Sequence, residues 1–306
     1  MCETMKAKLI SLLLLPSLLL SITLFTNLYS QETRPHKIIY LVSGPRSLSV
    51  AFTRMMYARG DFEIFHEPSL YAYTSARYPE FASLTYAEDG FKSFEEVKRA
   101  ILAASIKNPV FVKEISSSAA EFIAKDAEFM QNEQVHFVFL ARNPHHSTIS
   151  FYKKIYQIPP DFPHLIGLEP LYQLYTAVKE KAKHPPIVIL SEDLYSKPEK
   201  TVDIFCKMVG IKPLPHALSW ENLGAKFDGK SEWHDVKKTA SLAHWHGRAL
   251  QSEGFRKPAS YEVDVQGEPT FSEVQDPKHR QACREAWKHN LPYYIKFKNE
   301  AGIHAN

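Results

Sequence analysis

The stretch that decides the fold is KIIYLVSGPRSLSVAF, residues 37–52. It opens with the apolar run 38–42 and continues from Ser47 with apolar side chains at helical spacing, as far as Gly60, which we expect to cap the helix. A strand that passes through a short turn into a helix presents backbone N–H groups and the positive end of the helix dipole to an anion. The stretch therefore predicts an anion-binding loop.

The side chains of this loop suit the same ligand. Gly44 lets the backbone approach closely, and Arg46, which follows Pro45, supplies a forked donor suited to phosphate oxygens. Ser47 and Ser49 can donate hydroxyls or cap the helix. The Walker pattern Gly-x4-Gly-Lys-Ser/Thr is absent, which removes the usual arrangement for binding a magnesium nucleotide. An ordinary serine-capped turn is the alternative interpretation.

Four further apolar runs follow the first one along the chain. They are FEIF (62–65), VFV (110–112), HFVFLA (136–141) and IVIL (187–190). Nearly continuous apolar strands of this length are typical of a parallel sheet that is buried on both faces. The runs therefore predict the strands of one central parallel sheet.

Helix signals lie between the predicted strands. The sequence predicts helices over Ala119–Met130, from Pro144 with Asn143 as N-cap, and over Glu199–Val209 between Pro198 and Gly210. Strands that alternate with helices in this way predict a three-layer α/β fold. From about Leu214 the periodicity fades, and we expect a loop-rich appendage of the same domain that ends in a helix near Pro277–Lys296.

The amino terminus differs in character from the rest of the chain. Lys6 and Lys8 precede residues 9–25, which are apolar and contain no charged residue. A positive flank followed by an apolar stretch is typical of a secretory signal or a retained signal anchor, and cleavage after Ser30 is plausible. We expect residues 1–30 to target the chain to a membrane or the secretory route, and residues 36–306 to form the domain. A buried core helix is the alternative.

Composition excludes several classes of protein. Among the 306 residues, Lys and Arg (37) exceed Asp and Glu (34) by only 3, which is too small an excess to indicate a strongly basic nucleic-acid-binding protein. The three cysteines exclude a disulfide-built scaffold, and the sequence leaves open whether Cys206 and Cys283 pair. His244-x-His246 and His145-His146 lack a third ligand at a recognised spacing, so no metal site is expected.

A second pair of polar residues follows the fourth predicted strand. Arg142 leaves that strand and Ser150 comes eight residues later in the next predicted helix, so together they could bind a phosphate from two sides. This pair resembles the 3′-phosphate motif of sulfotransferases. SGPRSLS (43–49) resembles their 5′-phosphosulfate loop in its Arg form, and residues 188–211 resemble a later element of the family. FHEPSLYAY (65–73) is similar to a segment of a bacterial and plant branch of the family.

The resemblance implies a P-loop-NTPase-like α/β fold and the donor 3′-phosphoadenosine-5′-phosphosulfate (PAPS). It further implies transfer of a sulfonate to a hydroxyl or amine of an acceptor that the sequence does not identify, without a required metal. Donor-binding residues would then be Gly44, Pro45, Arg46, Ser47 and Ser49. Arg142 and Ser150 would bind the 3′-phosphate of the same nucleotide.

Sulfonate transfer needs a base for the nucleophile and positive charge on the leaving group. Arg46 is the candidate for the leaving 5′-phosphate, and Glu67, just past the second strand, is the candidate base. Neighbours in an extended segment point opposite ways, so His66 is expected to face away from Glu67. Glu67 could instead be a structural carboxylate that holds the loop.

The third predicted strand ends in Lys113, which is a candidate contact for the sulfonate or a strand-end lysine that reaches solvent. Ile115 stands where cytosolic sulfotransferases carry a histidine base, which excludes a histidine mechanism at that position. Glu114 alternates to the other face and receives no role.

Two rival functions remain. A P-loop kinase is favoured by Glu192-Asp193, which follow a strand and could hold Mg²⁺, although the missing Gly-Lys-Ser/Thr argues against it. A non-catalytic nucleotide-binding relative is favoured by the missing histidine after the third strand. Trp233 and Trp245 could stack on an adenine or an acceptor ring, and Arg256-Lys257 could approach the 3′-phosphate.

Overall fold

The computed structural model describes residues 35–77, 90–155, 157–223, 240–255 and 267–301. The chain from His36 onward forms one compact unit. Within the described ranges, no helix combines the length and the apolar character needed to cross a membrane. The apolar residues 9–25 lie outside the described residues, so the targeting prediction is not tested here.

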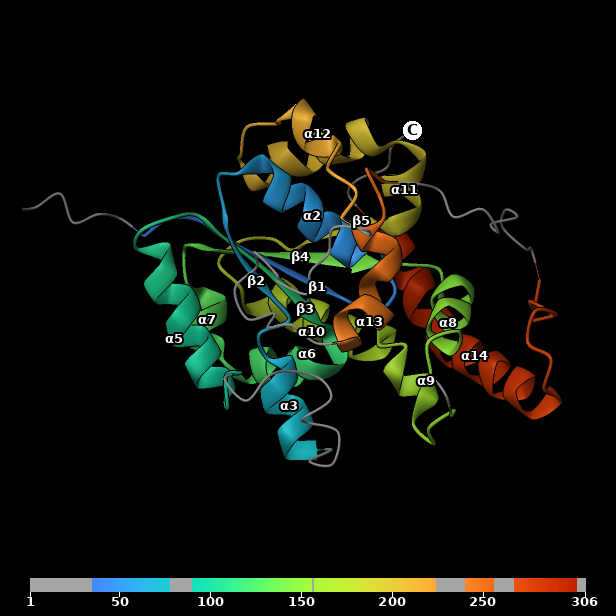
Figure 1. Ribbon diagram of the computed structural model, residues 1–306. Helices are drawn as coiled ribbons and strands as arrows, with labels where there is room; N and C mark the ends of the chain where they lie inside the picture. The colour runs from blue at the N-terminus through green and yellow to red at the C-terminus, as the bar shows by residue number, and fades with distance from the viewer. Residues whose placement is uncertain (1–34, 78–89, 156, 224–239, 256–266, 302–306) are drawn as a thin grey trace, which may run out of the picture. The chain divides into compact units, whose positions relative to one another are not determined.

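The sheet confirms the prediction drawn from the five apolar runs (Figure 1). Its strands are β1 (Ile38–Ser43), β2 (Glu63–His66), β3 (Val110–Ile115), β4 (Val135–Ala141) and β5 (Ile187–Leu190). They pair in parallel in the order β2-β3-β1-β4-β5, so β1 lies in the centre. Because all the strands are parallel, their carboxyl ends meet at one edge of the sheet, which is where ligands bind in this type of fold.

Helices cover both faces of the sheet and complete the predicted three layers (Figure 1). One face carries α2 (Ser49–Arg59), α11 (Ser191–Ser196), α12 (Pro198–Val209) and the short 3₁₀ helix η1 (Pro215–Leu218). The other face carries α5 (Phe94–Ser105), α6 (Ser116–Lys125), α7 (Ala127–Gln131) and α10 (Leu168–Lys181). The remaining helices are α3 (Leu70–Arg77), α8 (Pro144–Tyr152), α9 (Phe162–Leu165), α13 (Ala240–Leu250) and α14 (Pro277–Glu300).

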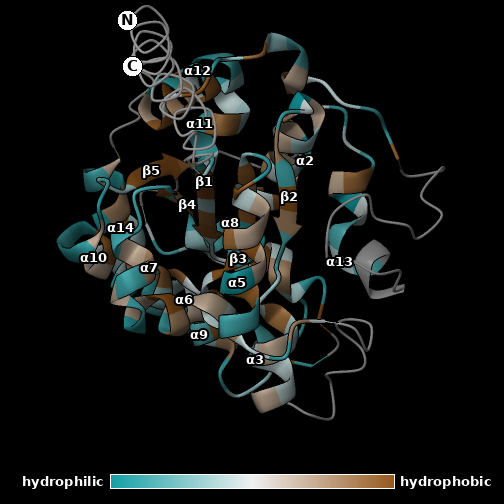
Figure 2. Ribbon diagram, turned by 90° about the vertical axis from the view of Figure 1, so that its left-hand side faces the viewer, coloured by the Kyte–Doolittle hydropathy of each residue, from teal (hydrophilic) through white to brown (hydrophobic). Residues whose placement is uncertain are grey.

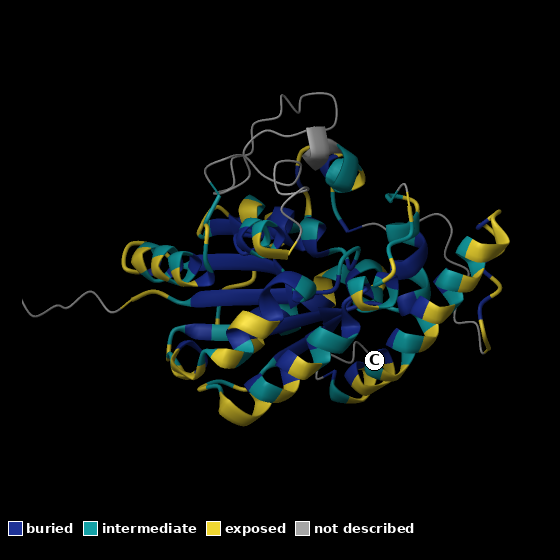
Figure 3. Ribbon diagram, turned by 90° about the horizontal axis from the view of Figure 1, so that it is seen from below, coloured by how far each residue is buried: buried dark blue, intermediate teal, exposed yellow. Residues whose placement is uncertain are grey.

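The core divides between the two faces because side chains alternate along each strand. Ile39 and Leu41 pack with Phe52 of α2 and Phe205 of α12, whereas Tyr40 packs with the cluster on the other face. The strands are mostly hydrophobic (Figure 2), and they are largely buried while the outer sides of the helices are exposed (Figure 3). This burial on both faces is the reason that the strands read as continuous apolar runs.

Several predicted helix ends are confirmed. Gly60 and Gly210 end α2 and α12 in the left-handed conformation, with φ of 73° and 71°. Asn143 caps α8, since its side-chain oxygen accepts a hydrogen bond from the His145 N–H at 3.0 Å, and Pro144 is the first helical residue. Asp126 makes the prediction of one helix over Ala119–Met130 wrong, because it ends α6 and its carboxylate caps α7 through the Phe129 N–H at 2.9 Å.

One described part of the carboxyl-terminal region is helical where the sequence predicts loops. Helix α14 begins at Pro277 as predicted, but α13 occupies part of the stretch for which we predicted loops. The end of α13 is bound by Arg54 of α2, which donates to the carbonyls of Ala249 at 2.9 Å and Leu250 at 2.8 Å. Cys206 and Cys283 are both buried and free.

Candidate active site

The loop between β1 and α2 is held in a tight conformation at the carboxyl edge of the sheet. Arg46 and Leu48 both have left-handed backbones, with φ of 62° and 65°, which for non-glycine residues costs about 1–3 kcal/mol each and is common at functional sites. A Cβ on Gly44 would lie 2.7 Å from the Ile166 carbonyl oxygen, so only glycine fits there. The hydroxyl of Ser47 donates to the Gly44 carbonyl at 2.7 Å. The loop therefore has one well-defined shape.

The residues that directly follow β4 and β5 form hydrogen bonds with the backbone of this loop. Arg142, at the end of β4, is 4% exposed and donates through Nη1 to the Arg46 carbonyl. Burial lowers the pKa of Arg142 to about 10, which still leaves the guanidinium charged at neutral pH. The hydroxyl of Ser191 donates to the carbonyls of Ser47 at 2.6 Å and Ala141 at 3.1 Å. A permanent positive charge is thus fixed directly beneath the loop.

The Arg46 side chain links the loop to two other elements. Its Nε donates to Ser150 Oγ of α8 at 3.1 Å, and its Nη1 donates to the Trp245 carbonyl of α13 at 2.5 Å. Burial and the charge of Arg248 lower the pKa of Arg46 to about 10. The structure therefore brings together Arg46, Arg142 and Ser150, which the sequence placed in two separate motifs.

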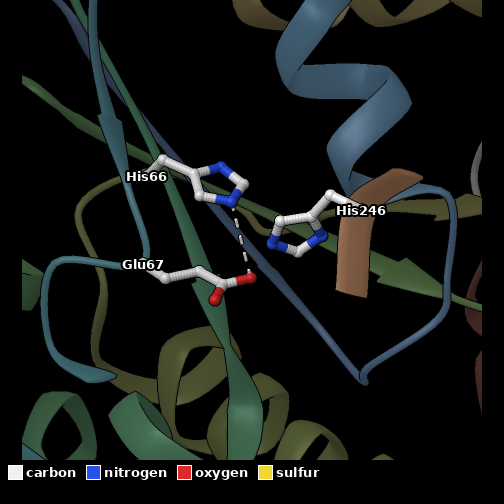
Figure 4. Close-up of side chains that lie close together, drawn as sticks. All are labelled: His66, Glu67 and His246. Atoms are coloured by element: carbon white, nitrogen blue, oxygen red, sulfur yellow. Dashed lines mark ion pairs between the residues drawn. The ribbon is translucent and has the colours of Figure 1, made fainter. Parts of the chain in front are cut away.

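A second cluster lies beside these arginines, where β2 and β3 end (Figure 4). Glu67 accepts an ion-pair contact from the ammonium of Lys113, and both side chains are almost fully buried. His66 Nε2 lies 3.7 Å from Glu67 Oε1, and the rings of His66 and His246 meet edge to face with centroids 5.3 Å apart. Glu67 also adopts a left-handed backbone, with φ of 55°.

The expectation that His66 faces away from Glu67 is wrong. It assumes an extended chain, whereas the left-handed backbone at Glu67 turns the two neighbouring side chains toward the same centre. The sequence also missed His246, which it considered only as part of a metal pattern. His246 reaches the cluster from α13, and its Nδ1 is buried without a hydrogen-bond partner among the described residues.

Charge and burial set the protonation state of each residue in this cluster. Burial alone would raise the pKa of Glu67, but the ammonium of Lys113 and the neighbouring imidazoles hold it far below its usual range. Burial lowers the pKa of His246 to about 4 and lowers that of His66 well below its usual value. At neutral pH the site therefore holds the Glu67 carboxylate, which is paired with Lys113, beside two neutral imidazoles.

Glu114, to which the sequence assigned no role, is fully buried on β3. Its Oε1 accepts a hydrogen bond from the Ser69 N–H at 2.9 Å, which fixes the chain just before α3. Burial raises the pKa of this carboxyl to about 8, so it is largely protonated at neutral pH. Glu114 is therefore a structural group beneath the site.

Comparison with known proteins assigns the chain to a family. A family model for the sulfotransferase domain matches residues 36–269, which is well over half of the chain. The chain belongs to the sulfotransferase family. This confirms the resemblance to sulfotransferases, and with it the expected P-loop-like α/β fold.

The sulfotransferase is also similar to solved structures of low identity. They include the sulfotransferase domain from the curacin biosynthetic pathway (17% identity, 87% of this chain and 98% of that chain, TM-score 0.47). The sulfotransferase domain from the Synechococcus PCC 7002 olefin synthase is 14% identical. The match covers 88% of this chain and 96% of that chain, with a TM-score of 0.47. Mouse sulfotransferase SULT7A1 complexed with PAP is 17% identical. The match covers 87% of this chain and 89% of that chain, with a TM-score of 0.46. The comparison with curated proteins finds no match.

A cavity of about 410 Å³ opens beside the Arg142 end of β4 in this sulfotransferase. It lies between the start of α8 and α14, and its lining includes Asn143, His145, Trp287 and Tyr294. Its volume falls in the range of about 300–1,000 Å³ that small-molecule sites occupy. Aromatic and polar side chains together suit a flat, hydrogen-bonding ring.

The acidic pair that favoured a kinase has structural contacts here. Glu192 accepts hydrogen bonds from the Asn143 N–H at 3.1 Å and the Tyr294 hydroxyl at 3.2 Å. These contacts fix the turn between β4 and α8 to α14. The carboxylate of Glu192 therefore has a role that needs no magnesium.

Two groups of three side chains in the described residues could hold a metal ion, and one is the active-site group His66, Glu67 and His246. The sequence did not predict either group, because their members come from separate elements. At the active site Glu67 already contacts the Lys113 ammonium, a positive charge that would repel a cation. The donor set of this group therefore fits a metal poorly.

Of the aromatic and basic residues proposed from the sequence as ligand contacts in the carboxyl-terminal region, the structure describes only Trp245. Trp245 is half-buried and packs against Phe151, with ring centroids 5.7 Å apart. Trp233, Arg256 and Lys257 lie outside the described residues.

Proposed function

We propose that the chain transfers a sulfonate from PAPS to a hydroxyl or amine of an acceptor. The observation that carries this proposal is the convergence of Arg46, Arg142 and Ser150 at one edge of the sheet, beside a cluster that holds two neutral imidazoles. Two fixed guanidinium groups suit a ligand with several anionic oxygens. A neutral imidazole next to them supplies a proton acceptor for the nucleophile.

The donor is assigned to these elements as follows. Its 5′-phosphosulfate lies in the loop Gly44–Ser49, where the start of α2 and the Arg46 side chain face the charge. Its 3′-phosphate lies against Arg142 and Ser150. The cavity beside Asn143 and Trp287 then accommodates the adenosine. The relative complexed with PAP is consistent with this class of nucleotide.

His246 is proposed as the base in place of Glu67. The Glu67 carboxylate is already engaged in a buried ion pair with the Lys113 ammonium, which disfavours its taking up a proton. His246 is neutral and half-buried, and its Nδ1 has no hydrogen-bond partner within the described ranges, whereas His66 is completely buried. An anionic donor beside Lys113 and Arg46 would also offset the charges that hold the pKa of His246 down, and so make it a stronger base.

In this arrangement the acceptor hydroxyl or amine attacks the sulfur in line with the bridging oxygen of the donor. Its proton passes to His246, the S–O bond to the 5′-phosphate breaks, and adenosine 3′,5′-bisphosphate leaves with the electron pair. Arg46 stabilises the charge that develops on the leaving phosphate. Lys113 holds Glu67 in place and contributes positive charge near the transferred group.

Binding of adenosine 3′,5′-bisphosphate to the purified chain tests the proposal. We expect Arg142→Ala to weaken binding about 10- to 150-fold, because hydrogen bonds to charged groups contribute about 1.5–3 kcal/mol. Calorimetry measures this, and transfer from labelled PAPS to a panel of hydroxyl and amine acceptors measures activity. Arg99→Ala, an exposed arginine on α5, is the matched control and should bind normally.

Absence of bisphosphate binding by the unaltered chain, or equal binding by Arg142→Ala, contradicts the proposal. Tight binding without transfer to any acceptor would favour a non-catalytic nucleotide-binding protein instead. Magnesium-dependent ATP turnover would favour the kinase.

We also propose that residues 9–25 direct the chain to a membrane or the secretory route, on the basis of their apolar run behind Lys6 and Lys8. A reporter fused after residues 1–35 should sediment with membranes or be exported. The variant Leu13→Lys/Leu19→Lys should abolish this, since each buried charge costs about 2.5–3.5 kcal/mol at the centre of an apolar segment. A reporter that stays in the soluble cell fraction contradicts the proposal. The mass of the product distinguishes a cleaved leader from a retained anchor.

A further inference from the structure

A second group of potential metal ligands lies away from the active-site cluster, where α9, α10 and α14 meet. His164 comes from α9, Glu169 from the first turn of α10, and His289 from α14. His164 Nδ1 lies 3.1 Å from Glu169 Oε2, and His289 Nε2 lies 2.8 Å from the same oxygen. One donor atom of each residue lies within 4.8 Å of the others. Two imidazole nitrogens and a carboxylate oxygen thus converge on one point.

We propose that His164, Glu169 and His289 form a binding site for a divalent transition-metal ion such as Zn²⁺. Two histidines and one carboxylate are a donor set that zinc accepts, at distances of about 2.0–2.2 Å. Donor atoms around a tetrahedral ion of that size lie about 3.3 Å apart. The two observed N–O separations are close to that spacing, so small side-chain rotations bring all three atoms to the ion.

The backbone holds these three residues in place. Gly167, with φ of 79°, reverses the chain between α9 and α10, which brings His164 and Glu169 to the same side. Asn290 of α14 accepts a hydrogen bond from the Leu168 N–H at 3.1 Å and donates to the Pro163 carbonyl at 2.7 Å. Because His289 precedes Asn290, the same contacts fix its position relative to the turn. The site is therefore preorganised by main-chain hydrogen bonds.

The surroundings also suit an ion. The second carboxylate oxygen of Glu169 accepts a hydrogen bond from Gln173 Nε2 at 3.4 Å, which leaves Oε2 for the ion. The His164 side chain is 63% exposed, while those of Glu169 and His289 are 22% and 28% exposed. The ion can enter from solvent, and water can fill the fourth position. In contrast to the active-site group, no lysine ammonium contacts this carboxylate among the ion pairs of the described residues.

A bound ion would act on the donor loop through the turn between α9 and α10. The Ile166 carbonyl packs against Gly44, and the Gly167 carbonyl accepts a hydrogen bond from Ser116 Oγ at 2.7 Å. An ion that joins α9, α10 and α14 therefore stabilises the backbone on which the donor loop rests.

Zinc binding to the untagged full chain tests this proposal. Calorimetry with Zn²⁺ alone at pH 7 should find one ion per chain at this site, and the same concentration of zinc should raise the Tm by several degrees. His289→Ala and Glu169→Gln should each weaken binding at least about 10-fold and abolish the rise in Tm. His216→Ala, an exposed histidine in η1, is the matched control and should bind like the unaltered chain.

The two candidate groups can be separated by one further variant. Zinc binding that survives in His289→Ala and is lost in His246→Ala would place the ion at the active site and overturn the proposal. Absence of zinc binding by the unaltered chain would also overturn it. The Tm of each variant without zinc shows that it is folded, and Glu169→Gln keeps the shape of the side chain should His289→Ala fail to fold.

Discussion

Replacing Lys113 by methionine is expected to destabilise the protein by about 3–5 kcal/mol, because it leaves the Glu67 carboxylate buried without its partner. Urea unfolding at pH 7 measures this loss. Transfer activity should also fall sharply, since Glu67 would no longer be held at the site. Equal stability of Lys113→Met and the unaltered chain would contradict the ion pair.

The double variant Lys113→Met/Glu67→Gln is the matched control. It removes both charges and should regain most of the lost stability without regaining activity. A stability equal to that of the single variant would show that the methionine itself, and not the unpaired carboxylate, causes the loss.

The stability of the unaltered chain and that of Lys113→Met should change with pH in opposite directions. In the unaltered chain the pKa of Glu67 is held far below its usual range, so this carboxylate adds stability that is fully present above its unfolded pKa and is lost progressively as the pH falls from there toward the lowered value. In Lys113→Met the ammonium is lost, and burial, which is the largest influence on Glu67, then raises that pKa. The variant should therefore be most stable at low pH and lose stability as the pH rises through the raised value.

Replacing His246 by glutamine is expected to lower the rate of sulfonate transfer about 10²- to 10⁴-fold, the usual contribution of a positioned general base. Binding of adenosine 3′,5′-bisphosphate should be nearly unchanged, because the phosphates are assigned to Arg46 and Arg142. A loss of rate at unchanged nucleotide affinity would separate a base from a merely structural residue.

His244→Gln provides the matched control two residues away on α13. His244 Nε2 pairs with the Lys154 carbonyl at 2.8 Å rather than with the active-site cluster, so its replacement should cost little activity. If Glu67→Gln rather than His246→Gln abolishes transfer while the fold is retained, Glu67 is the base, as the sequence predicted.

The pH profile of the free enzyme, reported by kcat/KM, gives an independent measure. Burial lowers the pKa of His246 to about 4, so kcat/KM should stay flat between about pH 5.5 and 7.5, where an ordinary histidine with a pKa of about 6.5 would titrate. The rate should fall only as the pH drops toward 4, when the imidazole takes up a proton. An inflection near 6.5 that persists in His246→Gln would exclude His246 as the base.

The sequence was informative wherever the structure depends on neighbours along the chain. The five strands, the end of α2 at Gly60 and the cap of α8 at Asn143 follow from local apolar patterning and from residues that fix turns. The loop proposed to bind the donor could be predicted in the same way, because Gly44–Ser49 is a continuous segment. The helix break at Asp126 was missed because its carboxylate caps the next helix, an outcome that periodicity does not register.

The cluster around Glu67 could not be predicted from the sequence, because its members are brought together by tertiary packing. His246 comes about 180 residues after Glu67, and α13 is bound to α2 by the backbone contacts of Arg54. Alternation along a strand placed His66 and Glu67 on opposite sides, and a single left-handed residue reversed that result. Lys113 was expected to face a ligand or solvent and instead pairs with Glu67.

By itself, then, the sequence determined that this protein has a parallel α/β sheet and belongs with the sulfotransferases, and it predicted an anion-binding loop after the first strand. Those properties rest on short-range periodicity and turn chemistry, which act within a few residues. Only the tertiary structure decided which side chains surround the reacting centre, and that three residues from α9, α10 and α14 converge. Long-range contacts, burial and the electrostatics that follow from burial exist only once distant segments have packed.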